Sequence, residues 1–286
     1  MHEPDSMELR RLALAVSVLD DVDLGPTDDG VRLTGKPTID VSWKDLRRAL
    51  GGADPGDELG RSRVRAWLRG RRIAADIRPD LLLTQARPVG VPVDHPLHPG
   101  LDWVRHRVLG DTLDLGIGFV GVSVDPDEVV IIPQTALTVA GVDPMPWWPV
   151  ARDYLERMGN VAGARFADQP MLRPIGDCDV VTLLGSRSLR QALCNRDVTG
   201  MCAVAAPMRT RGWLELSRID PAFTAVAAAA TAVEDRGFPR PLLLTIDEIT
   251  MATDGGRPAE IVLRDPAVSS TAFSSSAGLP RVRYRP

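Results

Sequence analysis

The stretch from Val180 to Cys194 holds the residue types best suited to chemistry. An apolar run, Val-Val-Thr-Leu-Leu, leads into Gly185-Ser186-Arg187-Ser188, and a helical pattern follows from Leu189. We interpret this pattern as a strand that turns into a helix. The first backbone N–H groups of a helix have no acceptor within the helix, and the helix dipole favours negative charge beside them. The turn therefore predicts a site for a small anion such as a phosphate group.

The predicted anion site has five members: Gly185, Ser186, Arg187, Ser188 and Arg190. Its two arginines can add full positive charge to the helix start. Ser188 and Gln191 lie three residues apart and can instead form a capping box, which satisfies the helix start without a ligand. The glycines are too sparse for a dinucleotide-binding fingerprint, so no cofactor is predicted.

Three histidines, His95, His98 and His106, lie close together in the sequence. Neutral imidazoles are ordinary ligands of zinc and iron, so a metal site is one interpretation. His95 and His98 each precede a proline, however, and no helical face holds their rings together. We therefore favour a polar loop and predict no bound metal.

Arginines gather in two predicted helices, Ser42 to Leu50 and Asp57 to Gly70. Arginine pairs with phosphate and guanine, so the stretch from Arg61 to Arg72 is compatible with a DNA-reading motif. The break from Gly51 to Gly56 is longer than the usual tight turn of such a motif, and acidic residues flank it. Arginine also outnumbers lysine throughout the chain, which indicates the codon bias of a GC-rich bacterial genome. We therefore expect a solvated arginine face and not a nucleic-acid partner.

Two adjacent tryptophans, Trp147 and Trp148, stand between Pro146 and Pro149 at the start of a predicted helix. Neighbouring side chains of an extended segment point in different directions, so we expect one indole at the surface. Exposed aromatic side chains are enriched where proteins meet. This pair therefore predicts a contact between subunits.

Composition limits the classes of protein that this chain can belong to. Its 286 residues carry a formal net charge of −4, which excludes a protein that coats nucleic acid or anionic membranes with its whole surface. The apolar run from Leu12 to Leu19 is too short to span a bilayer, and no basic signal-peptide region precedes it. Cys178, Cys194 and Cys202 form no Cys-x-x-Cys pair and are expected to be buried thiols. We expect a cytoplasmic protein without membrane contact.

The spacing of apolar residues predicts the elements that position these groups. Strands are expected at Leu12–Leu19, Val31–Val41, Leu115–Val124, Glu128–Ile132, near Thr135–Ala140, at Val180–Leu184 and at Met201–Ala206. The clearest helix has Asp220 as N-cap, Pro221 in its first turn and Gly237 just after its end. A hairpin is expected between Leu242–Met251 and Glu260–Leu263.

These elements predict an α+β fold of mixed sheets and short helices. Pro88, Pro92, Pro96 and Pro99 exclude a helix or a central strand from the segment that holds them. We therefore place a proline-rich connector at residues 87–100, after an N-terminal sheet and helix-pair unit at 1–86. A larger mixed unit follows at 101–264, and small residues predict a flexible tail at 265–286.

The function predicted from the sequence is non-catalytic binding or assembly, with a small anionic ligand at the Gly185–Ser188 turn. A homo-oligomer or another protein is the expected partner. One alternative is an enzyme acting on a phosphorylated or acidic small molecule, in which Arg187 and Arg190 bind the anion and Asp179 or the histidines supply the chemistry. A second alternative is a regulator that binds DNA through Arg61 to Arg72.

Overall fold

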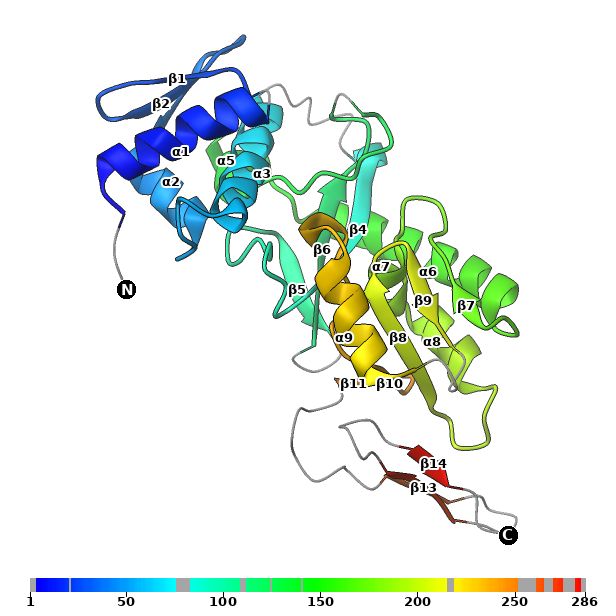
Figure 1. Ribbon diagram of the computed structural model, residues 1–286. Coiled ribbons are helices and arrows are strands. Elements are labelled where there is room, and N and C mark those ends of the chain that lie inside the picture. Colours follow the sequence, from blue (N-terminus) through cyan, green and yellow to red (C-terminus); the bar gives the residue numbers. More distant parts are fainter. Residues whose placement is uncertain are drawn as a thin grey trace. The chain divides into compact units, whose positions relative to one another are not determined.

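The computed structural model has the α+β fold that the sequence predicts, with helices and antiparallel sheets (Figure 1). It describes residues 4–20, 22–75, 83–108, 112–123, 125–139, 141–214 and 219–251, and three further strands near the C-terminus. Those strands are β12 (Ile261–Arg264), β13 (Ser270–Ser274) and β14 (Arg281–Arg283), which pair in the order β12-β13-β14.

The chain forms two compact units and passes between them several times. Unit 1 contains Met1–Ala86, Pro99–Val104 and Ile117–Val150, and unit 2 contains Arg87–His98, Arg105–Gly116 and Ala151–Pro286. The structure thus divides the chain differently from the linear scheme of two units and a connector. Most of the predicted connector lies in unit 2, while residues 117–150 of the predicted larger unit lie in unit 1.

Unit 1 begins with three helices around a small sheet. Its elements are α1 (Ser6–Leu19), β1 (Leu24–Pro26), β2 (Gly30–Leu33), β3 (Ile39–Ser42), α2 (Trp43–Leu50), α3 (Glu58–Ala75) and α5 (Gln134–Val139). The strands pair antiparallel in the order β1-β2-β3, and the predicted strand at Val31–Val41 is divided between β2 and β3. The helix predicted after Ser42 is also confirmed, with Ser42 as N-cap and Gly51 ending it at a φ of 57°.

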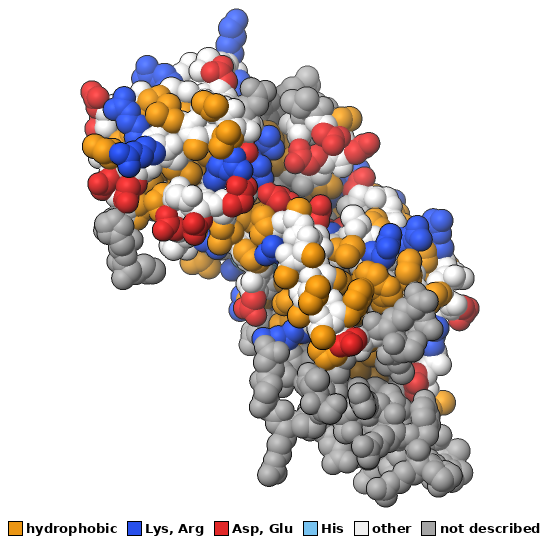
Figure 2. All heavy atoms as spheres, viewed as in Figure 1, with side chains coloured by type: hydrophobic (Ala, Val, Ile, Leu, Met, Phe, Trp, Pro, Cys, Tyr) orange, Lys and Arg blue, Asp and Glu red, His pale blue; other side chains and the backbone are white. Residues whose placement is uncertain are grey.

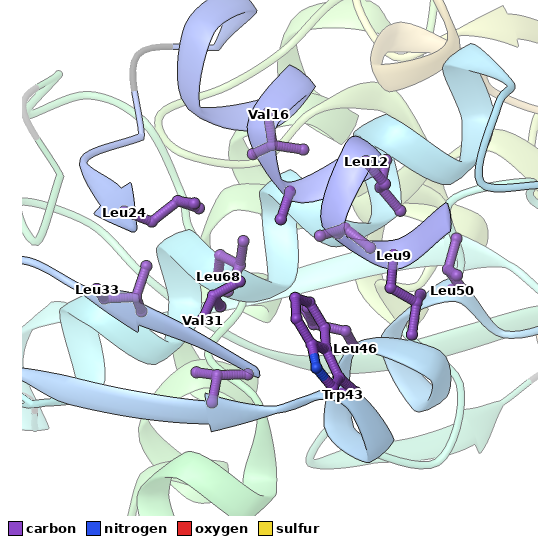
Figure 3. Close-up of a cluster of buried hydrophobic side chains, with 13 residues drawn as sticks. Leu9, Leu12, Val16, Leu24, Val31, Leu33, Trp43, Leu46, Leu50 and Leu68 are labelled. Atoms are coloured by element: carbon purple, nitrogen blue, oxygen red, sulfur yellow. The ribbon is translucent and has the colours of Figure 1, made fainter. Parts of the chain in front are cut away.

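The buried side chains of this unit come from all of these early elements. Figure 3 shows leucines and valines of α1 and β2 meeting Trp43, Leu46 and Leu50 of α2 and Leu68 of α3. Each helix contributes one apolar stripe, so packing of the stripes removes the apolar surface from water and stabilises the unit.

Helix α1 corrects the predicted strand at residues 12–19. Asp5 caps it, because its Oδ1 accepts hydrogen bonds from the N–H groups of Met7 and Glu8, both at 2.8 Å. The Glu8 carboxylate in turn accepts from the Asp5 N–H at 2.9 Å, which completes a capping box. The run Leu12–Leu19 alternates large and small residues, which fits a strand, but the buried positions Leu9, Leu12, Ala13 and Val16 follow helical spacing.

The remaining elements complete the description of the chain, and three of them contain residues of both units. They are β4 (Ala86–Pro92), β5 (Arg105–Val108), β6 (Leu113–Phe119), α6 (Trp147–Phe166), β7 (Met171–Leu172), α7 (Val180–Leu184), α8 (Arg187–Cys194), β8 (Cys202–Met208), β9 (Arg211–Trp213), α9 (Pro221–Ala230), η2 (Val233–Asp235), β10 (Leu242–Leu244) and β11 (Ile249–Met251). One sheet has the order β4-β6-β5 and the other the order β11-β10-β8-β9-β7.

Several predicted elements differ from the observed ones. Residues 134–139 form helix α5 where a strand was expected, and α6 extends from Trp147 to Phe166. Helix α9 starts at Pro221 as predicted but ends at Ala230. The segment Leu242–Met251, predicted as one strand, forms both strands of a hairpin, β10 and β11. The strand predicted to pair with it corresponds to β12, which pairs with β13. The turn predicted at residues 254–256 lies outside the described residues, and β13 and β14 fall within the predicted tail.

The proline-containing strand β4 lies at the edge of its sheet, where missing N–H groups are tolerated. The backbone of Gly90 on this strand is bound by side chains. Its N–H donates to Thr182 Oγ1 at 2.8 Å, and its carbonyl accepts from Arg209 Nη2 at 3.0 Å. A Cβ at Gly90 would lie 2.9 Å from Thr182 Cα, so a larger residue cannot approach α7 this closely. These contacts fix α7 beside β4.

Candidate functional site

The predicted anion site lies at a junction between two helices, which corrects the predicted strand-to-helix turn. Residues 180–184 form α7, capped by Asp179, whose Oδ1 accepts from the Thr182 N–H at 2.7 Å. Gly185 ends α7, and Ser186 is the N-cap of α8, accepting from the Leu189 N–H at 3.3 Å. Ser186, and not Ser188 as in the predicted capping box, therefore caps α8.

A carboxylate of the chain itself binds the start of α8. Glu156 on α6 accepts hydrogen bonds from the backbone N–H groups of Arg187 and Ser188, both at 3.0 Å. The hydroxyl groups of Ser186 and Ser188 donate to the same carboxylate at 3.0 and 2.7 Å. The helix start therefore binds the side chain of Glu156, whose negative charge suits the helix dipole.

The environment of Glu156 keeps it charged. Burial acts to raise the pKa of this carboxyl, but the hydrogen bonds from Ser188, Arg187 and Ser186 outweigh burial and hold the pKa below its usual value. Gly159, one turn later on α6, makes the close approach possible, because a Cβ there would lie 1.9 Å from Ser186 Oγ. The spacing of Glu156 and Gly159 on one helix was the only signal of this contact in the sequence.

The two arginines of the predicted site have different roles. Arg190 is buried, and its Nη1 and Nε donate to the carbonyl oxygens of Leu184 and Ile246 at 2.8 and 2.9 Å. Burial lowers the pKa of its guanidinium. Arg187 is exposed and pairs with the exposed carboxylate of Asp247 at 3.2 Å. Arg190 therefore connects α7, α8 and the β10–β11 turn. The four hydrogen bonds to the Glu156 carboxylate come from backbone N–H and serine hydroxyl groups and not from either guanidinium.

Asp177 and Asp179, on either side of Cys178, belong to two separate ion pairs. Asp177 accepts hydrogen bonds from Arg87 Nε and, at 3.1 Å, from the Tyr154 hydroxyl. Asp179 accepts from Arg209 Nη1. Burial and the neighbouring carboxylates raise the pKa of Cys178 to about 12, so this thiol stays protonated near neutral pH. Asp179, the candidate acid of the enzyme alternative, therefore caps α7 and pairs with arginine.

The three histidines do not form one cluster. His98 Nε2 lies 3.0 Å from Oδ2 of the buried Asp114, whose carboxylate also binds Arg105 and Arg107 at 3.1 Å. His95 is buried nearby, while His106 is exposed on β5. Among the described residues, no group of three or more His, Cys, Asp or Glu side chains is arranged to hold a metal ion.

His95 is held neutral by its surroundings. Its Nδ1 accepts from the Leu97 N–H at 3.0 Å, and its Nε2 has no hydrogen-bond partner within the described residues. Burial, together with the positive charges of Arg209 and His98, lowers its pKa to about 4. The imidazole therefore belongs to the interior of unit 2.

Most arginines of the predicted DNA-binding stretch donate to groups of unit 1. Arg63 Nη1 donates to the Leu50 carbonyl at 2.7 Å, Arg65 Nη1 pairs with Asp20 at 3.0 Å, and Arg72 Nη1 donates to the Pro37 carbonyl at 2.7 Å. Arg61 pairs with Glu58 and lies 3.9 Å from Asp20. These side chains hold α3 against its neighbours, and a phosphate backbone would have to compete with those contacts.

The two tryptophans of the predicted interface differ in exposure. Trp147 is buried, and its ring meets Phe119 edge to face with centroids 5.0 Å apart. Trp148 is partly exposed. Trp147 therefore stabilises unit 1 from within, and only Trp148 has surface available for a subunit contact.

An exposed apolar surface on α9 was not identified from the sequence. One side of this helix covers β8, with Thr224 and Ala228 buried. Its outer side consists only of apolar residues: Ala222, Phe223, Ala225, Val226, Ala229 and Ala230. Figure 2 shows hydrophobic atoms over this helix. Phe223 is held by Trp213, with ring centroids 5.3 Å apart. Alanine-rich composition had suggested only close packing.

No family model, no curated protein and no solved structure matches this chain. Within the described ranges, no helix combines the length and hydrophobicity that crossing a bilayer requires.

Proposed function

We propose that this protein has a non-catalytic role in assembly, and that the outer face of α9 binds the same face of a second copy. The observation that supports this proposal is the composition of that face. Val226 is 68% exposed and Phe223 is 43% exposed, and the other exposed residues of the helix are alanines. A helix that is apolar on all sides is normally covered on all sides.

The absence of charge on this face favours a second copy as its partner. A twofold interface brings identical patches together, so charged groups would meet groups of the same sign. The described residues of α9 include no charged side chain. Its alanines also allow two helices to approach closely, while the two Phe223 rings supply rigid apolar area.

The expected association is weak because the face is short. A helix of ten residues is about 15 Å long, which gives less contact than the roughly 800 Å² per partner of a standard interface. We therefore expect a dissociation constant in the micromolar range, which corresponds to a binding free energy of about −8 kcal/mol.

Sedimentation equilibrium of the full chain tests this proposal. Val226→Asp should weaken self-association at least tenfold, because each copy would place a carboxylate in the apolar contact. Val198→Asp is the matched control, since Val198 is 76% exposed and lies outside α9. Both variants should unfold at nearly the same temperature as the wild type. A wild type that stays monomeric at 0.1 mM (roughly 100 times the micromolar scale), or equal weakening by both variants, would rule out this role of α9.

A further inference from the structure

The outer side of α1 carries a second exposed apolar surface, in unit 1. Met7 is 61% exposed, Leu14 is 44% exposed and Val18 is 80% exposed. The inner side of the same helix is already buried in the core of the unit, through Leu9, Leu12, Ala13 and Val16. The outer residues are therefore not required for the packing of α1 onto its own unit.

The spacing of the outer residues is that of a helix–helix seam. Met7, Arg11, Leu14 and Val18 are separated by four, three and four residues, so they follow one line along α1. This is the spacing of the a and d positions through which two helices pack side by side. We call these four residues the outer stripe. Figure 2 shows both hydrophobic and basic side chains in the region of this helix.

The charge within and beside the outer stripe is positive. Arg10 and Arg11 are both exposed, and neither pairs with a carboxylate among the residues that the structure describes. Arg11 Nη2 lies 3.8 Å from the sulfur of Met7, so its side chain follows the stripe. The one acidic residue of the helix, Glu8, is used in the capping box with Asp5. This distinguishes α1 from α3, where Arg63, Arg65 and Arg72 donate to groups of the unit.

We propose that the outer stripe binds an amphipathic helix of a different protein, with acidic residues flanking its apolar seam. The a and d spacing matches a helical partner, and Arg10 and Arg11 would pair with its carboxylates. A second copy of α1 fits less well, because it would bring four exposed arginines into one contact. This proposal concerns a different surface and partner from those of α9 and does not depend on self-association.

Two synthetic helical peptides provide the test. Both have leucine at the a and d positions, and they differ only in carrying glutamate or lysine at the e and g positions. Fluorescence anisotropy measures their binding to the full chain. The glutamate peptide should bind at least tenfold more tightly than the lysine peptide. Leu14→Asp should weaken binding of the glutamate peptide at least tenfold, because it places a carboxylate in the apolar seam.

Charge reversal and a control on the other surface complete the experiment. Arg10→Glu combined with Arg11→Glu should reverse the preference, so that the lysine peptide binds more tightly. Val226→Asp should leave binding of both peptides unchanged, which separates this result from the test of α9. Thermal unfolding checks that each variant is folded.

The proposal is overturned if neither peptide binds or if both bind equally. It is also overturned if Leu14→Asp abolishes self-association of the chain, since the partner would then be a second copy. Binding to phosphatidylserine vesicles that is lost in Leu14→Asp would show instead that the stripe contacts a lipid surface.

Discussion

The α7–α8 junction and the outer faces of α9 and α1 use their side chains in opposite ways. At the junction, the helix start and Arg190 bind groups of the chain itself. On α9 and α1, large apolar side chains remain exposed although other residues of the same helices are buried. The residue types that first suggested ligand chemistry therefore stabilise the fold, while the surfaces available for a partner are apolar. Stability measurements on variants of unit 2 test whether these buried polar groups stabilise the fold.

The largest effect is expected from Arg190→Ala. It leaves the carbonyl oxygens of Leu184 and Ile246 without their donor in a buried place, so we expect the free energy of unfolding to fall by about 3–5 kcal/mol. Arg187→Ala removes only an exposed ion pair with Asp247 and should cost less than about 1 kcal/mol. Urea denaturation measures both. Equal losses would show that Arg187 also has a structural role.

Glu156→Ala should have the next largest effect. It removes the acceptor of four hydrogen bonds at the start of α8, and we expect a loss of about 2–4 kcal/mol by thermal or urea unfolding. Asp153→Ala, exposed on the same helix, is the matched control and should change stability little. If the junction binds anions as described, acetate should raise the melting temperature of Glu156→Ala more than that of the wild type. Equal stabilisation of the two proteins would contradict this account.

His95 should make stability depend on pH. Its pKa is about 4 when folded, against 6.5 in an unfolded chain, so the unfolded state binds more protons between these values. Stability is therefore lost as pH falls from 6.5 towards 4, by about 2–3 kcal/mol from this group. His95→Asn, which keeps an acceptor for the Leu97 N–H, should flatten that part of the curve. An unchanged slope in urea midpoints between pH 7 and 4.5 would show that other groups cause the pH dependence.

Two helices were located well from the sequence. The helix predicted from Ser42 to Leu50 and the helix start at Asp220 and Pro221 agree with the structure, because capping depends on residues within a few positions of each end. The strands predicted at residues 12–19 and 180–184 were wrong for a related reason. Both are short apolar runs, which fit a strand or a buried helix equally, and the capping signals at Asp5 and Asp179 were overlooked.

The candidate site was predictable only in part. The sequence indicated a helix start just after Gly185, because capping residues act locally, but it placed the cap at Ser188 and not at Ser186. It did not identify Glu156, which lies 30 residues before Ser186 and meets it only because Gly159 allows α6 and α8 to approach. The burial of Trp147 against Phe119 is likewise a long-range contact.

The sequence was sufficient for the α+β class and for two helix starts, because apolar spacing and capping hydrogen bonds involve residues that are close together along the chain. Tertiary packing determines which side chains are buried or bonded to other groups of the chain and which remain at the surface. That outcome depends on which distant segments pack together, because a carboxylate, an arginine or a tryptophan is available to a partner only where no other part of the chain has already covered or bound it.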